Sequence, residues 1–344
     1  MIKELCVVGH PTKLGGADTE LDHQIRLWRN MGIDVYICHT GDFHEHDHNL
    51  KKMKQEMLNL GCKYLPSRSW KNLEGFHVIS FCNGEFLKAL PEIKKYARTT
   101  SFVNCMTWNF NQELEMHKKD LIDFFLYQTQ HQFDKCSIKL KNISESNYRP
   151  LFFDPYFDDN DFPFINRDNN DLFRFGRISR GDADKYGPTQ LWIYETMTAP
   201  VLKSGIILGW DDRAKKKLGH PPNYVKTLKE GEISQQEFYK QCDVIIMTTD
   251  TFENLPRIGF EAISSGSLLV VDNRGGWKVL VEDGKTGWLC NDNREFVYKA
   301  SRSAFETNES NDMRIAAKTK LEKKWGKNNA AESWKTVFKS WNKI

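Results

Sequence analysis

Residues 250–289 read DTFENLPRIGFEAISSGSLLVVDNRGGWKVLVEDGKTGWL, and this stretch decides the fold class. Two acids, Glu253 and Glu261, are separated by seven residues. Pro256 stands between them where a helix can begin, because proline at the first helical position loses no hydrogen bond. The apolar run SLLVVD then reads as a buried strand. The stretch therefore predicts a loop, a helix and a strand, with Glu253 in the loop and Glu261 in the helix.

The start of this helix is a candidate phosphate site. Free N–H groups after Pro256 would point out of the helix, and the helix dipole favours negative charge there. Glu261 could accept hydrogen bonds from two ribose hydroxyls, and Glu253 could accept them from hydroxyls of a sugar. Taken alone, two acids at this spacing could equally form a solvated face.

Outward from this stretch, short apolar runs alternate with amphipathic segments. The runs before residue 150 are LCVVGH, DVYICH, HVISFC, TSFVNC and DFFLYQ, and those after residue 170 are LFRFGRI, SGIILGW, DVIIMTT and SLLVVD. Continuous apolar strands between helices indicate parallel sheets covered on both faces. The sequence thus predicts an α/β protein with two Rossmann-like, doubly wound domains facing across a cleft. We place them at residues 1–150 and 171–310, with a Pro- and Asp-rich linker at 151–170 and helices at 311–344.

Composition narrows the function classes. The 344 residues carry a net charge of +3, and no basic stripe marks the chain as a binder of nucleic acid. Eight cysteines form no C-x-x-C pair, which indicates reduced thiols rather than a disulfide framework. No run approaches the roughly 20 apolar residues of a membrane span, and the N-terminal run is too short for a signal peptide. We expect a cytoplasmic enzyme.

The ordered motifs resemble the signature of family-4 retaining glycosyltransferases, which have the GT-B fold. The matching pieces are Glu253, Glu261, Ala262, Gly266, the strand SLLVV, Gly275-Gly276 and Gly284 to Gly287. The resemblance implies transfer of a sugar from a UDP- or GDP-sugar to a glycan or other hydroxyl acceptor, without a metal or other cofactor. It implies a catalytic role for Glu253 and donor binding by Glu261, Asn254, Leu255, Pro256, Arg257 and Ile258. This chain departs from the pattern at NLPRIGF, where relatives have a glycine-rich loop, and at Val279, where relatives often have Glu.

A second motif lies in LFRFGRISRGDADKYGP. In the family, an Arg at a strand end and a following Lys neutralise the donor diphosphate, whose charge grows as the glycosidic bond breaks. Arg177 matches by its position at the strand end and Lys185 is the lysine, so both are expected to be catalytic. Arg180 is the second choice because it lies at the usual spacing from Lys185. Without the resemblance, these would be ordinary surface cations.

The N-terminal loop VVGHPTKLGGADTELDHQ resembles the family's first loop. Gly15 and Gly16 would let the backbone approach the donor, with Asp18 near the acceptor. The loop is not G-x-G-x-x-G, which disfavours NAD, and a plain tight turn would look the same. Acceptor-side candidates are Thr107, Trp108 and Asn109, with His131 a weaker one. The stretch Val225–Leu228 is expected to pass the nucleobase through its backbone.

Several alternatives stay open. The cluster His39, Asp42, His44, His46, Asp47 and His48 fits no standard zinc spacing and reads as a polar loop. A nucleotide-sugar epimerase, a non-catalytic nucleotide-sugar-binding protein and a DNA-base-modifying glycosyltransferase are rival functions. The Lys- and Trp-rich C-terminal segment is expected to pack back on the N-terminal domain, as in relatives, and peripheral contact with an anionic membrane is the less favoured alternative.

Overall fold

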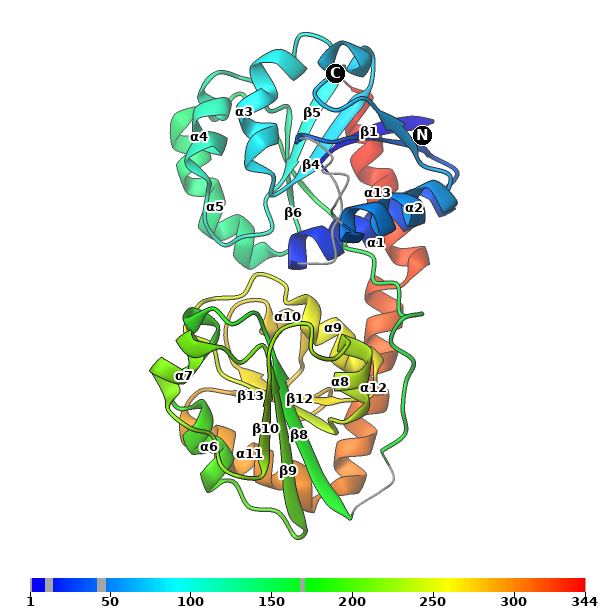
Figure 1. Ribbon diagram of the computed structural model, residues 1–344. Coiled ribbons are helices and arrows are strands. Elements are labelled where there is room, and N and C mark those ends of the chain that lie inside the picture. Colours follow the sequence, from blue (N-terminus) through cyan, green and yellow to red (C-terminus); the bar gives the residue numbers. More distant parts are fainter. Residues whose placement is uncertain (1, 10–14, 42–47, 168–170, 344) are drawn as a thin grey trace. The chain divides into compact units, whose positions relative to one another are not determined.

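The structure is a computed structural model, and it describes residues 2–9, 15–41, 48–167 and 171–343. The chain forms two units: unit 1 contains Met1–Asp158 and Lys324–Ile344, and unit 2 contains Asp159–Lys323 (Figure 1). Each unit holds one parallel β-sheet between layers of helices. The expected pair of doubly wound α/β domains is therefore confirmed.

The sheet of unit 1 has the strand order β3-β2-β1-β4-β5-β6-β7, and neighbouring strands pair in parallel. The strands are β1 (Glu4–Val8), β2 (Asp34–Cys38), β3 (Lys63–Leu65), β4 (His77–Phe81), β5 (Thr99–Val103), β6 (Phe124–Tyr127) and β7 (Pro150–Phe152). All five apolar runs predicted here form strands. The edge strands β3 and β7 were not predicted, because three residues are too few to show a period.

Helices cover both faces of this sheet: α1 (Gly16–Asn30), α2 (His48–Asn59), α3 (Gly84–Ile93), α4 (Asn111–Lys118), α5 (Gln130–Ile143) and α13 (Lys327–Trp341), with a 3₁₀ turn η1 (Trp70–Leu73). One apolar core lies between the sheet and α1, α2 and α13. The other lies between the sheet and α3, α4 and α5. Gly61, with φ of +80°, follows the end of α2 as expected.

The C-terminal helix α13 completes the core of unit 1. Trp334 is fully buried, lies edge-on to Trp28 with ring centroids 4.8 Å apart, and donates from Nε1 to Gln24 Oε1 at 2.7 Å. Trp325 and Trp341 are buried too. Trp334 and Trp341 therefore hold α13 on the sheet. Together with Trp325, which precedes α13, they do not form an exposed aromatic face.

The sheet of unit 2 has the parallel order β10-β9-β8-β11-β12-β13. Its strands are β8 (Leu172–Ile178), β9 (Leu202–Leu208), β10 (Val225–Leu228), β11 (Val244–Met247), β12 (Leu268–Asp272) and β13 (Trp288–Cys290). Its helices are α6 (Gln190–Thr196), α7 (Asp212–Leu218), α8 (Gln235–Lys240), α9 (Arg257–Ser264), α10 (Trp277–Leu280), α11 (Asn293–Phe305) and α12 (Thr307–Trp325), with a 3₁₀ turn η2 (Ala183–Lys185). The stretch Val225–Leu228, expected to pass the nucleobase, is edge strand β10.

The domain boundaries lie elsewhere than the expected ones. Strand β7 and the residues up to Asp158 belong to unit 1, so the Pro-rich stretch is divided between the two units. Helix α12 runs through residue 310 and stays with unit 2 as far as Lys323. Only the last part of the predicted C-terminal segment, α13, packs on unit 1.

The topology of unit 2 marks one place on its sheet for a ligand. The chain leaves β8 toward β9 on one side and later leaves β11 toward β12 on the other, so the strand order reverses between β8 and β11. Ligands of open parallel sheets bind at the carboxyl ends of the strands at such a reversal. The loops after β8 and after β11 therefore flank the candidate site.

Candidate functional site

Two of the three residues predicted to be catalytic meet at this reversal. Lys185 ends the 3₁₀ turn η2 after β8, and Glu253 lies in the loop between β11 and α9. The Lys185 Nζ is 2.8 Å from Glu253 Oε1, and the two side chains are 23% and 20% exposed. A backbone bond from Asp250 N to Asp184 O, 3.1 Å long, ties the two loops together. The pair is therefore a half-buried ion pair on a fixed backbone.

The backbone of Gly275-Gly276 packs directly against the backbone of the Glu253 loop. Gly276 N donates to Glu253 O at 2.8 Å. A Cβ on Gly276 would lie 1.6 Å from Asn254 O, and one on Gly275, whose φ is +55°, would lie 2.5 Å from Glu253 O. Only glycine permits this approach of two backbones. The two glycines therefore help to fix the position of the Glu253 backbone.

Arg177 is the next-to-last residue of β8, and it does not face solvent. Its guanidinium is fully buried, stacks 3.7 Å from the centroid of the Tyr186 ring, and donates to Lys185 O at 2.7 Å and to Gln190 Oε1 at 3.3 Å. Burial lowers the pKa of Arg177 from its ordinary value. The Arg177 side chain therefore hydrogen-bonds the backbone of Lys185. Direct contact between Arg177 and a diphosphate stays a prediction.

Arg180, the alternative to Arg177, lies on the surface. Its side chain is 57% exposed, and its Nε is 3.4 Å from an oxygen of Asp182. An exposed pair of this kind contributes little to stability and leaves the arginine able to move.

Helix α9 begins at Arg257, with Pro256 as its N-cap, one residue later than the sequence predicts. Glu261 is only 2% exposed and accepts a hydrogen bond from Tyr239 Oη at 3.0 Å. Burial raises the pKa of Glu261 to about 7. The two acids are thus not a solvated face, and the contact of Glu261 with a ribose stays a prediction.

The other predicted donor-loop residues fill the space between Glu253 and the helix. Asn254, Leu255, Pro256 and Arg257 are buried, and Ile258 is half-buried. Their side chains therefore pack the loop, and a donor would meet mainly the backbone N–H groups of the first turn.

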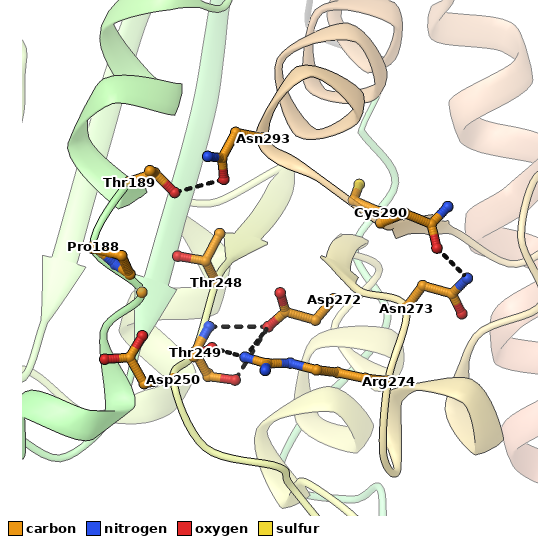
Figure 2. A pocket seen from close by; sticks show the side chains of 12 residues that line it. Pro188, Thr189, Thr248, Thr249, Asp250, Asp272, Asn273, Arg274, Cys290 and Asn293 are labelled. Carbon is orange, nitrogen blue, oxygen red and sulfur yellow. Dashed lines mark hydrogen bonds and ion pairs between the residues drawn. The ribbon is translucent and has the colours of Figure 1, made fainter.

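A polar cavity of about 320 Å³ opens at the carboxyl ends of β11, β12 and β13 (Figure 2). Asp272 accepts bonds from Thr249 N at 2.9 Å and from Thr249 Oγ1 at 3.1 Å, while Arg274 reaches across to the carbonyl oxygen of Thr249. The rest of the lining is Gly187, Pro188, Thr189, Thr248, Asp250, Asn273, Cys290, Asn291 and Asn293. Carboxylate, amide and hydroxyl groups of this kind hydrogen-bond the hydroxyls of sugars.

None of these lining residues was predicted from the sequence. Thr248, Thr249 and Asp272 stand at the ends of the runs DVIIMTT and SLLVVD, so their position directly after buried strands was the available signal. The cavity shares the loop after β11 with Glu253, and thus extends the candidate site along the same edge of the sheet.

In unit 1 the predicted residues lie at the start of one helix and in one loop. Gly15 is the N-cap of α1, whose helix begins at Gly16 and holds Asp18 in its first turn. Thr107, Trp108 and Asn109 lie between β5 and α4, and Trp108 is 54% exposed. Because β1 and β5 are parallel members of one sheet, the start of α1 and the loop after β5 follow strands that end at the same, carboxyl edge. Their roles stay predictions.

Most of the predicted histidine cluster falls on residues that the structure does not describe. Asp42, His44, His46 and Asp47, and the side chain of His48, lie outside the described residues. His39 Nδ1 accepts a bond from Gly41 N at 3.0 Å, and His131 lies in α5. In the described parts of the chain, no group of three or more His, Cys, Asp or Glu side chains could hold a metal ion. None of the described helices is both long and apolar enough to span a bilayer.

Comparison with protein families by sequence gives a match that lies almost entirely in unit 2. The family model described as "Glycosyl transferases group 1" matches residues 219–329, which include Glu253, Glu261 and Gly275-Gly276. No curated protein matches the chain by sequence. The family match covers the motif region of unit 2.

Solved structures match the whole chain. HepE of Anabaena, solved with UDP and glucose, has a TM-score of 0.72 at 15% identity, and the match covers 98% of this chain and 100% of that one. TarM of S. aureus, a mutant solved with fondaparinux, a GlcNAc-glycerol and UDP, has a TM-score of 0.73 at 11% identity, covering 98% and 100%. A glycosyltransferase of Rickettsia africae has a TM-score of 0.72 at 13% identity, covering 99% of both. The chain therefore has the GT-B fold of two parallel-sheet α/β units.

Proposed function

We propose that this chain is a retaining, metal-independent glycosyltransferase that moves a sugar from a UDP-sugar to a hydroxyl acceptor. Glycans are the first acceptors to test. The ion pair of Lys185 and Glu253, at the reversal of the unit 2 sheet and beside the N-terminus of α9, is the observation that carries the proposal. The group 1 family match and the UDP complexes of HepE and TarM support the choice of donor.

Lys185 would stabilise the leaving group. The diphosphate gains negative charge as the glycosidic bond breaks, and a positioned ammonium together with the N–H groups of α9 offsets that charge. Arg177 would add a second, buried positive charge and hold the Lys185 backbone in place through its 2.7 Å bond to the carbonyl oxygen. We propose that these two side chains do the work that a divalent cation does in other transferases.

Glu253 would bind the donor sugar. Its carboxylate can only accept hydrogen bonds, so it suits sugar hydroxyls. Lys185 holds one carboxylate oxygen at 2.8 Å, so a diphosphate that draws Lys185 toward itself would release this oxygen for the sugar. Glu261, held by Tyr239, would accept the ribose hydroxyls.

The reaction would proceed by front-face substitution. The acceptor oxygen attacks the anomeric carbon from the side of the departing diphosphate, and the departing phosphate oxygen takes the acceptor proton. The anomeric configuration is then retained, and the chain contributes position and charge stabilisation. On unit 1, we propose that Gly15, Gly16 and Asp18 meet the substrates and that Thr107, Trp108 and Asn109 shape the acceptor pocket.

Transfer and donor hydrolysis by purified protein test the proposal. With a panel of UDP- and GDP-sugars and glycan acceptors, Glu253→Ala and Lys185→Ala should each lower the rate of UDP release at least ~10²-fold, the scale for losing one charge-stabilising group. The matched control is Lys320→Ala, because Lys320 forms a Lys–Glu pair with Glu282 at 2.9 Å in the same unit. NMR of the product reports its anomeric configuration.

The same assay separates the rival functions. An epimer formed from donor alone would indicate an epimerase, and donor binding with no turnover would indicate a non-catalytic binder. Transfer only to hydroxylated DNA bases would move the proposal to a DNA-modifying enzyme. Near wild-type turnover by both folded site variants would overturn the assignment of Lys185 and Glu253.

A further inference from the structure

The loop after β5 in unit 1 presents an exposed aromatic ring on a well-supported backbone. Trp108, in this loop, is 54% exposed, although tryptophan is highly buried on average in folded proteins. Its indole meets the Phe110 ring with centroids 4.7 Å apart and planes at 57°. Phe110 in turn lies edge-on to the buried Phe102, with centroids 6.1 Å apart. Phe110 therefore supports the indole on one side, and much of the Trp108 ring faces water.

Buried side chains hold the backbone of this loop. Asn104, directly after β5, donates from Nδ2 to Trp108 O at 2.9 Å, and its Oδ1 accepts from Met106 N at 2.9 Å. Gln132 of α5 donates from Nε2 to Met106 O at 3.1 Å. Asn104 and Gln132 are both buried. The loop thus has its backbone groups paired by side chains, which fixes the place from which the indole projects.

Glu113, in the first turn of α4, completes this network. Its Oε2 accepts from Phe110 N at 3.1 Å and from Asn104 Nδ2 at 2.9 Å. Glu113 is fully buried, and burial raises its pKa to about 7. A carboxyl group kept out of water is costly, and costs of this kind concentrate at functional sites. Here the carboxyl group holds Asn104, which holds the backbone of Trp108.

The residues around Trp108 define what the ring can bind. Residues 99–117 contain no Lys and no Arg, and the neighbouring polar residues that are not buried, Thr107, Asn111 and Gln112, are neutral. Nucleic acids and anionic bilayers are held mainly by Lys and Arg, so neither suits this loop. A pyranose ring has a face of C–H groups with partial positive charge, which packs on the negative face of an indole. Amide and hydroxyl groups beside the indole suit the sugar's hydroxyls.

We propose that Trp108 is the stacking platform for an uncharged pyranose unit of the acceptor, and that Asn104 and Glu113 are positioning residues that hold this platform. The inference rests on the proposed transferase function and deepens it, because it names a class of acceptor and the side chain that binds it. The acceptor ring must offer a C–H face to the indole. A carboxylate on that ring would find no cation in the loop.

Saturation-transfer NMR of the full chain, with UDP present, tests binding directly. The probes are the methyl glycosides of glucose, galactose, N-acetylglucosamine and xylose. We expect saturation of the ring C–H protons of at least one glycoside, loss of this signal in Trp108→Ala, and a largely retained signal in Trp108→Phe. The matched control is Trp192→Ala, because Trp192 is another exposed tryptophan, 44% exposed in α6 of unit 2, and this variant should bind like the wild type.

Kinetics with a glycoside that accepts sugar separate the platform from the rest of the enzyme. Trp108→Ala should raise the acceptor KM by ~10-fold, the scale of one aromatic contact, while the donor KM and donor hydrolysis without acceptor stay unchanged. Glu113→Ala should also raise the acceptor KM, and Glu113→Gln should restore it, because the Gln oxygen accepts the same two hydrogen bonds. In the Trp108→Ala background, Glu113→Ala should add little, since the platform that it holds is gone.

The outcomes distinguish this inference from the proposed function. Sugar transfer with an unchanged acceptor KM in Trp108→Ala would overturn the inference and leave the function standing. Glycoside binding that depends on Trp108, without any sugar transfer by the wild type, would overturn the function and keep the binding site. No saturation transfer to any glycoside, or binding of methyl glucuronoside as tight as that of methyl glucoside, would reject the uncharged pyranose.

A membrane role for Trp108 is tested in the same way. Sedimentation of the wild-type chain with phosphatidylcholine–phosphatidylserine vesicles, lost in Trp108→Ala, would make Trp108 a membrane contact and overturn the inference. No sedimentation is expected. Because Trp108 lies at the surface, its substitution leaves the core of unit 1 intact, and its variants decide the question whatever Glu113→Ala does to stability.

Discussion

Replacing Glu261 with Gln should change how the folding stability of unit 2 depends on pH. Burial raises the pKa of Glu261 from 4.5 to about 7, so the folded protein keeps a proton that the unfolded chain releases between these values. Stability must therefore fall as pH rises through this window. The shift is about 2.5 pKa units, and at ~1.4 kcal/mol per unit the wild type loses about 3 kcal/mol by pH 8.

Gln keeps the shape of the side chain and an oxygen that can accept from Tyr239, but it carries no charge at any pH. The free energy of unfolding of Glu261→Gln, minus that of the wild type, should rise by about 2.5 kcal/mol between pH 5 and pH 8, because a small part of the loss in the wild type has already occurred at pH 5. Urea titrations at four pH values measure it, and Glu230→Gln, at an exposed position of the same unit, is the control with a flat difference. A flat or falling difference for Glu261→Gln would refute the reasoning.

Three other predictions concern the loops and the core. Arg177→Lys keeps the charge but cannot make the bonds to Lys185 O and Gln190 together. Donor turnover should therefore fall at least ~10-fold, and donor affinity should fall with it. An unchanged kcat/KM would show that the Lys185 backbone needs no such support. Gly276→Ala should displace the Glu253 loop, because its Cβ would overlap Asn254 O, and turnover should drop. Gly231→Ala is the control: its φ of +84° strains the exposed turn locally, but no atom lies near the new Cβ, so turnover should stay at the wild-type rate. Trp334→Ala should destabilise unit 1 by about 3–5 kcal/mol in urea titrations, and a loss below 1 kcal/mol would contradict its place in the core.

The strand and helix pattern was largely readable from the sequence, because each central strand is a continuous apolar run. LFRFGRI coincides with β8, and the helix after Pro256 begins within one residue of its predicted start. The short strands β3, β7 and β13 escaped prediction, since three residues carry too little pattern. The boundary inside α12 escaped it as well, because the residues of a helix do not by themselves reveal which sheet the helix covers.

The candidate site, like the fold, could be predicted from the sequence only in part. The sequence by itself determined which residue types follow the strands, so Glu253, Lys185 and the glycine pair could be named from motif order and resemblance. Only the tertiary structure decided that Lys185 and Glu253, 68 residues apart, form an ion pair, that Arg177 lies buried beneath them, and that Arg314 of the last helix of unit 2 meets Asp243. The physical reason is that burial and pairing depend on which loops and helices the sheet order brings together, and no local run of residues encodes that order.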